Sequence, residues 1–482
     1  MGEQAGMIST LQACAIGKLD AHAQAALVAA GDATPELLVE AAILRIEALN
    51  PQLNAVSFRG YDAARQRAAF VQGPMAGVPW LLKDGLDYIG MPNRSGSRSR
   101  RDASPGSIAF EFTDRFDDTG LVALGKTNAP EFGLLPTTEP LLYGPAHNPW
   151  ALDRSPGGSS GGSAVAVASG MVPLAHAADG GGSIRIPASC CGLVGLKPSR
   201  GGNVRARDPH LIEDLLACDT LLSRSVRDAA WAYTIGAGRR TSAAGPSSGR
   251  LKIAVIRDNL NGMPPRSDVA DVLERATQLC EALGHQIEQR AWPVDGRAVM
   301  ASFRTIWGYL ARDSVAHVAS RIGSGAIADV LEPWTCSLAN WSNALMPADS
   351  GQLIEQIGRA SAAMAEFFCR YDVILSPVLR RSGLQIGELS PSRSFEHINE
   401  LMFDYVSYTP LHNLTGNPAI SLPLFTGADG TPIGSMFAAA RGKEDTLLAL
   451  AFELEEARPW ADRWPTWSAA TPPGCLERPT AS

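Results

Sequence analysis

Two glycine-rich segments near the middle of the chain constrain its fold more than any other sequence feature. The first, Ser155–Ser163, reads SPGGSSGGS, and the second, Asp179–Pro187, reads DGGGSIRIP. Glycine loses more backbone entropy on folding than any other residue, so this density indicates positions that need positive φ or very close backbone approach. Both segments therefore predict tight loops held by a rigid scaffold, and both are candidates for a site of chemistry.

The composition indicates a folded chain with a large hydrophobic core, and it argues against nucleic acid and membrane as binding partners. Of 482 residues, 45% are hydrophobic and the net charge is −7 at pH 7. Nucleic-acid binders cluster Lys and Arg, so an acidic chain argues against that class of partner. The longest uncharged stretch, Ser155–Ala178, is too rich in Gly, Ser and Pro for a membrane span, and the N-terminus has no secretory signal pattern. We expect a cytoplasmic protein that binds neither nucleic acid nor membrane.

The eight cysteines are scattered along the chain without a C-x-x-C pair. This spacing predicts neither a zinc site nor a disulfide scaffold. Cys280 lies in a helical pattern and Cys369 follows two phenylalanines, contexts in which a thiol behaves as a small hydrophobic group. We therefore expect free, buried thiols and no metal.

Short apolar runs, typical of strands buried on both faces, alternate with helical patterns along the chain. The predicted strands are 78–82, 121–124, 251–256, 285–288, 373–375, 419–424 and 433–440. The predicted helices are 35–49, 164–169, one capped by Ser267 and ended by Gly284, and 444–458, and the segment of about 295–370 is mainly helical. Residues 251–291 then form a βαβ-like unit, and the pattern as a whole indicates a sheet covered by helices.

Residues 120–127 read GLVALGKT and formally satisfy the phosphate-binding pattern G-x-x-x-x-G-K-[ST]. That loop needs flexible backbone between its glycines and a helix after its lysine. Here Leu121–Leu124 is a predicted buried strand, and Pro130 disfavours a helix directly after Lys126. We therefore predict that Lys126 is a structural residue at a strand end.

Residues 157–161 match the nucleophile-elbow pattern G-x-S-x-G. That motif requires a strand directly before it, and an acid and then a histidine downstream. Pro149–Pro156 does not form a convincing strand. The downstream histidines lack a distinctive context and are expected to be bystanders rather than catalytic bases: His176, His210, His285, His317, His397 and His412.

A third interpretation needs no histidine. Lys83 in the run Gly77–Asp84, the loop Gly157–Ser163, and the segment Asp179–Pro187 continuing to Gly192–Ser199 resemble the amidase signature family. The resemblance implies an α/β fold: a single large domain over 1–470, in which a mixed, mostly buried sheet is surrounded by helices. Its signature core would span about 75–200, its helical covering segment about 295–370, and 471–482 would be a tail.

The resemblance also implies a Ser-cisSer-Lys triad, with Ser183 as nucleophile, Ser159 as the bridging serine after a cis bond from Gly158, and Lys83 as the base. A serine hydroxyl becomes a good nucleophile only when a base takes its proton, and a lysine can do so only if its pKa is lowered. Because Lys83 follows a predicted strand that is buried away from water, desolvation would lower the pKa of its side chain. Two alternatives remain open: an ion pair of Lys83 with Asp84 or Asp87, and Ser160 or Ser163 in the bridging role or as helix caps.

Around the nucleophile, the resemblance implies an oxyanion hole formed by the backbone N–H groups of Gly180, Gly181, Gly182 and Ser183. Side chains at the glycines would block the approach of a carbonyl oxygen to these amides. Asp179 and Arg185 would then support the loop rather than react. One departure from the family is Ala178, where many members carry a hydroxyl or amide side chain.

Within the family, the segments Leu81–Asp84, Thr137–Pro140, His147–Trp150 and Ile186–Ser189 are most similar to the branch of 6-aminohexanoate cyclic dimer hydrolases and bacterial urethanases. We expect hydrolysis of a C–N bond in a small-molecule amide or carbamate, with aryl esters as further substrates and no cofactor. The main alternative is the glutamine-hydrolysing subunit of tRNA-dependent amidotransferases, which the run Arg200–Arg205 disfavours. A non-catalytic binding protein is disfavoured because all three triad positions are retained, and a homodimer is compatible with the sequence.

The walls of the substrate pocket are expected to come from Glu131–Tyr143, Gly201–Asp219 and parts of 300–345. Three tryptophans in the last segment could line a cavity or fill the core, and the core is the commoner fate of such residues: Trp307, Trp334 and Trp341. Arg205 and Arg207 lie in a glycine-flanked loop that we hypothesise to be a mobile lid.

Overall fold

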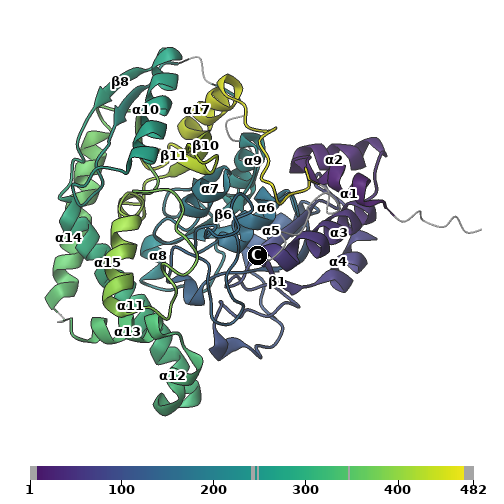
Figure 1. The fold of residues 1–482 in the computed structure, drawn as a ribbon, viewed down its shortest axis with the longest axis horizontal. Coiled ribbons are helices and arrows are strands. Elements are labelled where there is room, and N and C mark those ends of the chain that lie inside the picture. The colour runs from purple at the N-terminus through teal and green to yellow at the C-terminus, as the bar shows by residue number, and fades with distance from the viewer. Residues whose placement is uncertain (1–7, 240–244, 247–248, 346–347, 472–482) are drawn as a thin grey trace, which may run out of the picture.

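Two β-sheets lie at the centre of the molecule and helices cover them (Figure 1). The computed structural model describes residues 8–239, 245–246, 249–345 and 348–471. The strands are β1 (Val56–Arg59), β2 (Pro79–Lys83), β3 (Val122–Thr127), β4 (Leu174–Asp179), β5 (Gly195–Lys197), β6 (Cys218–Leu222), β7 (Lys252–Val255), β8 (Gln286–Gln289), β9 (Val373–Pro377), β10 (Ala419–Thr426) and β11 (Pro432–Ala439).

The helices precede, separate and follow these strands. In the first half of the chain they are α1 (Thr10–Gly17), α2 (Ala21–Ala30), α3 (Pro35–Leu53), α4 (Tyr61–Ala68), α5 (Glu111–Asp118), α6 (Gly161–Ala168), α7 (Arg185–Cys191), α8 (Glu213–Leu216) and α9 (Val226–Gly236). In the second half they are α10 (Ser267–Ala282), α11 (Gly296–Ile322), α12 (Ile327–Val330), α13 (Pro333–Asn343), α14 (Ala348–Phe367), α15 (Phe395–Tyr405), α16 (Pro410–Leu414) and α17 (Glu444–Ala457).

The strands are mixed in direction and divided between two sheets. The first has the order β1-β3-β2-β4-β6, and β2 runs parallel to both β3 and β4. The second has the order β5-β10-β11-β9-β7-β8. An antiparallel bridge between Val194 and Ser223 connects the two. The predicted α/β class is confirmed, with the strands in two connected sheets.

Most predicted elements lie where the sequence pattern put them, with differences at their ends. β7 and β8 are parallel and α10 connects them, as expected for a βαβ unit. Ser267 is the first residue of α10, and Arg266 occupies the N-cap without a side-chain cap bond. The expectation for Cys369 was wrong, because this thiol lies just beyond the end of α14 and is exposed, although the described cysteines are free as expected. The predicted tail lies outside the described residues, apart from Thr471.

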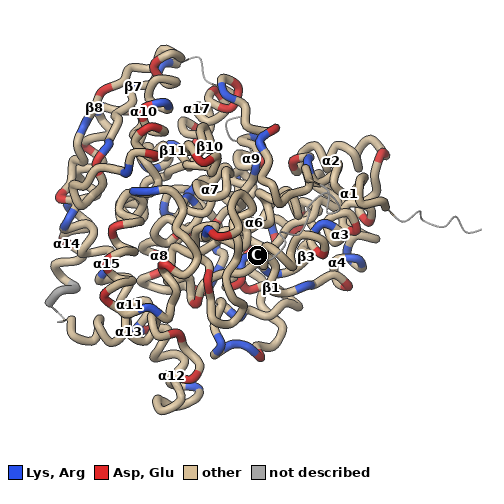
Figure 2. The backbone as a smooth tube through the Cα atoms, viewed as in Figure 1, with Lys and Arg blue, Asp and Glu red and all other residues tan. Residues whose placement is uncertain are grey.

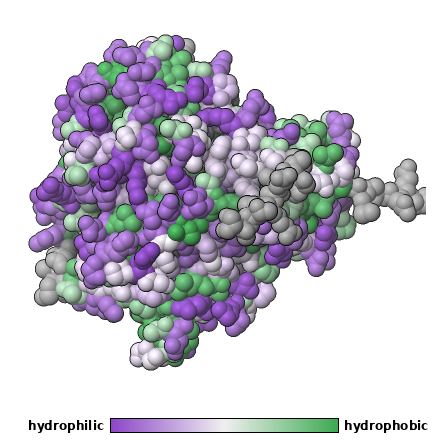
Figure 3. All heavy atoms as spheres, viewed as in Figure 1, coloured by the Kyte–Doolittle hydropathy of each residue, from purple (hydrophilic) through white to green (hydrophobic). Residues whose placement is uncertain are grey.

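The surface carries charges of both signs. Figure 2 shows Lys and Arg interspersed with Asp and Glu along the backbone. On the face seen in Figure 3, hydrophilic side chains dominate and hydrophobic ones form small separate areas. Within the described ranges, no helix is both long and apolar enough to cross a membrane.

The first sheet brings Lys83 close to the second glycine-rich loop. Lys83 is the last residue of β2, and Asp179 is the last residue of β4. Because β2 and β4 are parallel neighbours, their carboxyl ends meet at the same edge of the sheet. The first glycine-rich segment leads into α6. The second begins at the end of β4 and leads into α7, so it connects this sheet directly to a helix.

Candidate active site

The Lys83 amine lies against the first glycine-rich loop rather than against a carboxylate. Its Nζ donates a hydrogen bond to Ser159 Oγ at 2.6 Å, and both side chains are buried. The peptide bond between Gly158 and Ser159 is cis. Asp84 has other partners, since it accepts hydrogen bonds from Tyr143 Oη at 2.8 Å and from backbone amides. The alternative in which Lys83 pairs with a neighbouring aspartate is therefore wrong.

Burial changes the protonation of this lysine. Desolvation lowers the pKa of Lys83 from its ordinary 10.5 to about 7, because the charged ammonium is disfavoured away from water. The negative charge of Asp219 opposes this shift, and the positive charge of Arg207 adds to it. A lysine with such a pKa is partly the free amine at neutral pH, which is the form that can accept a proton.

The first glycine-rich loop is packed too tightly for side chains at some positions. A Cβ at Gly158 would lie 2.6 Å from the Thr137 carbonyl oxygen, so only glycine fits there. The two competing serines have partners away from Lys83. Ser160 Oγ exchanges hydrogen bonds of 3.3 Å with the Ala178 backbone, and Ser163 Oγ donates to the His176 carbonyl at 2.7 Å. Among these three serines, Ser159 alone contacts the lysine.

A buried ion pair supports the second glycine-rich loop. Arg185 and Asp179 are fully buried and their side chains meet at 2.9 Å. Burial alone would raise the pKa of Asp179, but the charge of Arg185 and its hydrogen bonds hold this pKa well below its ordinary value. Asp179 also accepts hydrogen bonds from the backbone amides of Gly182 at 2.7 Å and Ile184 at 3.2 Å. The carboxylate thus fixes the backbone on both sides of Ser183.

These contacts correct one expectation about the oxyanion hole. The Gly182 amide is not available to a substrate, because it already donates to Asp179. The backbone amides of Gly180, Gly181 and Ser183 have no hydrogen-bond partner within the described part of the chain. Three donors therefore remain beside the Ser183 hydroxyl, which belongs to a side chain that is 6% exposed.

Two supporting residues from the far end of the chain were not predicted from the sequence. Asn413 Nδ2 donates to Asp179 Oδ1 at 2.9 Å, and Asn413 Oδ1 accepts from Arg185 at 2.6 Å. Thr409 Oγ1 donates to the Gly181 carbonyl at 2.6 Å. Both residues lie in or next to α16, more than 200 positions from the loop, and no local pattern in the sequence connects the two segments.

The Asp179–Arg185 pair gives a test of stability. We expect Asp179→Asn to lower the free energy of unfolding by about 3–5 kcal/mol, because it leaves the Arg185 guanidinium buried without its counter-charge. Denaturant titration would measure this loss. Glu111→Gln is the matched control, since Glu111 forms an exposed ion pair with Arg115 at 2.7 Å and its loss should change stability by less than about 1 kcal/mol. Equal effects of the two substitutions would contradict the supporting role of Asp179.

A small apolar cavity of about 20 Å³ adjoins Ser183. It is lined from the predicted wall by Leu134–Pro136, and from α11 by Phe303 and Trp307. Trp307 belongs to the hydrophobic core as expected, at 8% exposed, and it also lines this cavity. Trp334 also belongs to the core, and it shares the Leu134 carbonyl with Trp307 as a hydrogen-bond acceptor.

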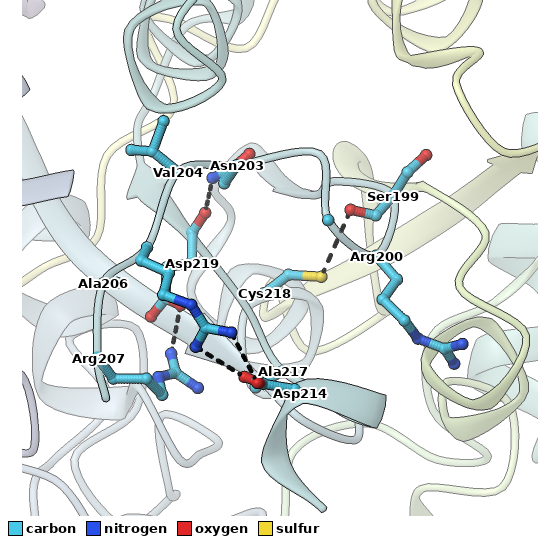
Figure 4. Close-up of a pocket in the computed structure, with 12 residues that line it drawn as sticks. Ser199, Arg200, Asn203, Val204, Ala206, Arg207, Asp214, Ala217, Cys218 and Asp219 are labelled. Carbon is cyan, nitrogen blue, oxygen red and sulfur yellow. Dashed lines mark hydrogen bonds and ion pairs between the residues drawn. The ribbon is translucent and has the colours of Figure 1, made fainter. Parts of the chain in front are cut away.

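The segment Gly201–Asp219 lines a different cavity, of about 300 Å³ (Figure 4). Ser183 is not among the residues around it. Arg205 donates to Asp214 at 2.9 Å, and Arg207 forms a partly buried ion pair with Asp219. The expected contribution of this segment to the wall beside Ser183 is therefore not observed. The mobile-lid hypothesis stays a prediction.

Within the described ranges, no group of three or more His, Cys, Asp and Glu side chains is placed to hold a metal ion. The groups gathered at the sheet edge are instead an amine, hydroxyls and free backbone amides. A sequence profile of the family described as Amidase matches residues 37–448 of this chain. The chain belongs to the amidase signature family.

Relatives of this amidase signature protein span nearly its whole length. It is 39% identical over 459 residues to the putative amidase AmiC of Mycobacterium leprae, covering 93% of this chain and 97% of the relative. It is 35% identical over 497 residues to the 6-aminohexanoate-cyclic-dimer hydrolase of Paenarthrobacter ureafaciens, covering 92% and 96%. The amidase signature resemblance seen in the sequence is thus confirmed.

Solved structures give the same assignment. A 6-aminohexanoate cyclic dimer hydrolase complexed with substrate matches with a TM-score of 0.86 and 31% identity, over 94% of this chain and 99% of the other. A glutamyl-tRNA(Gln) amidotransferase chain of Thermotoga maritima is more distant, with a TM-score of 0.72 and 25% identity over 96% and 100%. This amidase signature protein is therefore a hydrolase of carbon–nitrogen bonds other than peptide bonds.

Proposed function

We propose that the chain is a serine amidohydrolase that cleaves its substrate through an acyl-enzyme, with Ser183 as nucleophile, Ser159 as bridging serine and Lys83 as base. The observation that carries the proposal is the 2.6 Å hydrogen bond between the Lys83 amine and Ser159 Oγ. Burial supports it further, because the lowered pKa of Lys83 makes the amine a proton acceptor at neutral pH. The free backbone amides of Gly180, Gly181 and Ser183 would form the oxyanion hole.

In the first half of the reaction, Ser183 Oγ forms a bond to the carbonyl carbon while its proton passes through Ser159 Oγ to Lys83 Nζ. The carbonyl oxygen becomes an oxyanion, which accepts hydrogen bonds from the amides of Gly180, Gly181 and Ser183. Preorganised donors of this kind stabilise charge where it develops in the transition state. The C–N bond then breaks, and the proton returns through Ser159 to the leaving nitrogen, which departs as a neutral amine.

In the second half, water attacks the acyl ester and gives its proton to the same Ser159–Lys83 path. A second tetrahedral intermediate collapses, releases a carboxylic acid and restores the Ser183 hydroxyl. Carbamates and aryl esters would pass through equivalent intermediates, so we include them with uncharged amides as substrates. The 6-aminohexanoate-cyclic-dimer hydrolase relatives support this choice, because their name describes a cyclic amide as substrate.

A panel of substrates tests the proposal with purified protein. The panel contains an anilide, a cyclic aliphatic diamide, an aryl carbamate, a p-nitrophenyl ester and free glutamine. We expect turnover of one or more of the first three, none of glutamine, and loss of amide turnover by about 10²–10⁴-fold in Ser159→Ala. Turnover of glutamine alone would favour the amidotransferase alternative. Full activity of Ser159→Ala would contradict the proposed role of Ser159 in proton transfer.

A further inference from the structure

A charged cluster that the proposed mechanism does not use lies beside Lys83. Asp219, on β6, accepts a hydrogen bond from His176 Nε2 at 3.1 Å, and Arg207 forms an ion pair with its second carboxylate oxygen (Figure 4). The side chain of His176 is 2% exposed and that of Arg207 is 25% exposed. The carboxylate is therefore held between a buried ring and a guanidinium that is partly open to water.

These three groups together carry no net charge at neutral pH. Burial lowers the pKa of His176 below its ordinary 6.5, and the ring packs edge-on against Phe112 with 5.5 Å between centroids, so the imidazole is neutral. Burial alone would raise the pKa of Asp219, but the charge of Arg207 and the hydrogen bond from His176 lower it to about 2. Asp219 is therefore a carboxylate whose charge is cancelled by Arg207.

The sheet places this cluster close to the lysine. β4 lies between β2 and β6. Leu81 on β2 lies opposite Ala175 on β4, and three residues further along β4 Ala178 lies opposite Asp219. Lys83 and Asp219 are thus two strands apart at the same edge of the sheet, a lateral separation of roughly 10 Å at the usual strand spacing. At that distance an uncancelled charge changes the proton affinity of a buried amine by about tenfold.

Other charged groups near the lysine already have partners of their own. Asp179 is fully buried and is paired with Arg185 at 2.9 Å. Asp84 accepts a hydrogen bond from a tyrosine hydroxyl at 2.8 Å, and Lys126 on β3 donates to a backbone carbonyl. These groups keep their charges and partners when the side chain of Arg207 is changed, so they would not take over its effect on Asp219.

Arg207 decides whether the lysine faces a neutral pair or an uncancelled carboxylate. A carboxylate without its guanidinium would stabilise the ammonium form of Lys83, which cannot accept a proton. Resting on the proposed role of Lys83 as base, we propose that Arg207 is a positioning residue that acts through Asp219: it cancels the charge of this carboxylate and so keeps Lys83 in the free-amine form. The segment Gly201–Asp219, which does not line the cavity beside Ser183, then contributes to catalysis through its charge.

The test is the pH dependence of kcat/KM, measured with the substrate of the panel that shows the highest turnover. In the wild type the rise should be centred near pH 7. Arg207→Gln should move this centre up by about one pH unit, so that kcat/KM falls about tenfold at pH 6 and stays near the wild-type value at pH 9. Arg207→Lys keeps the charge and should keep the centre near pH 7. The shifted rise lies above the pH range in which His176 takes up a proton, so its ring cannot replace the guanidinium.

Three further variants separate the charges. Asp219→Asn should move the centre down, by less than one pH unit, because Glu213 lies 3.9 Å from Arg207 Nη1 and partly cancels the guanidinium. The double variant with Arg207→Gln removes both charges and should return the centre to its wild-type position. Arg205→Gln is the matched control, because Arg205 belongs to the same segment and forms an exposed ion pair with Asp214 at 2.9 Å, and it should leave the centre in place.

A purely structural role of Arg207 would have a different signature. It would lower kcat/KM equally at every pH and lower the thermal unfolding midpoint, without moving the centre of the rise. Unmoved centres in both Arg207→Gln and Asp219→Asn would overturn the proposal while leaving Lys83 as the base. If instead the wild-type rise is absent, or persists in Lys83→Met, the proposed base itself is wrong.

Discussion

Replacing Ser183 by alanine should reduce kcat for an amide substrate by about 10⁴–10⁶-fold, the range found when a serine nucleophile is removed. Without Oγ no acyl-enzyme can form, and the remaining amides of the loop stabilise only a direct attack by water. The side chain is small and buried next to a cavity, so the fold should tolerate its loss. Steady-state kinetics and the thermal unfolding midpoint of each protein would separate a chemical defect from a structural one.

Ser160→Ala is the control for this experiment. Ser160 lies one residue from Ser159 but its hydroxyl contacts only the Ala178 backbone. We expect this variant to keep kcat within a factor of about ten, since it loses two long hydrogen bonds to the Ala178 backbone and no reacting group. A Ser183→Ala protein with wild-type turnover would show that another residue attacks the carbonyl.

Replacing Lys83 by methionine should lower kcat/KM by about 10³–10⁴-fold at pH 8, because the substitution keeps the length of the side chain but removes the proton acceptor. In the wild type, kcat/KM should rise with pH and level off above about 7, where the buried amine has lost its proton. The methionine variant should lack this rise. A wild-type profile that is flat from pH 5 to 9 would argue against a lysine base.

Lys83→Met should lower activity but raise the free energy of unfolding at low pH. The pKa of Lys83 is about 7 in the folded protein and about 10.4 in an unfolded chain. Between these values the unfolded state binds more protons, so the free energy of unfolding contributed by Lys83 rises with pH in that window. Below pH 7 the cost of burying the ammonium is fully present. Chemical denaturation at pH 6 should therefore show Lys83→Met to be more stable than the wild type.

The parts of the site that were predicted from the sequence are those carried by local motifs. Lys83 lies at the end of a short apolar strand, and Ser159 and Ser183 lie in glycine-rich segments whose order and spacing are distinctive. Such signals can be recognised because neighbouring residues in the chain are also neighbours in the site. The same holds for most strands and helices, whose apolar periodicity reflects contacts within a few residues.

The parts that were missed depend on contacts between distant segments. Asn413 lies in α16 and Thr409 directly precedes it, and both donate hydrogen bonds to the loop around Ser183. Nothing near these two residues in the sequence indicates that they contact this loop. The engagement of the Gly182 amide by Asp179 depends on loop geometry, which glycine composition does not encode. Phe303 has the helical spacing of an ordinary core residue, and its close approach to Gly181 appears only once α11 packs against the loop before Ser183.

The proposed catalytic residues and the apolar side chains that line the cavity beside Ser183 come from different stretches of the chain. Lys83, Ser159 and Ser183 lie in or next to β2, α6 and α7, whereas Phe303 and Met402 belong to α11 and α15. During evolution, substitutions in these two later helices can change the wall of this cavity while the proposed catalytic residues stay unchanged. A gene library randomised only at α11 and α15 is therefore a compact starting point for engineering new hydrolases from this scaffold.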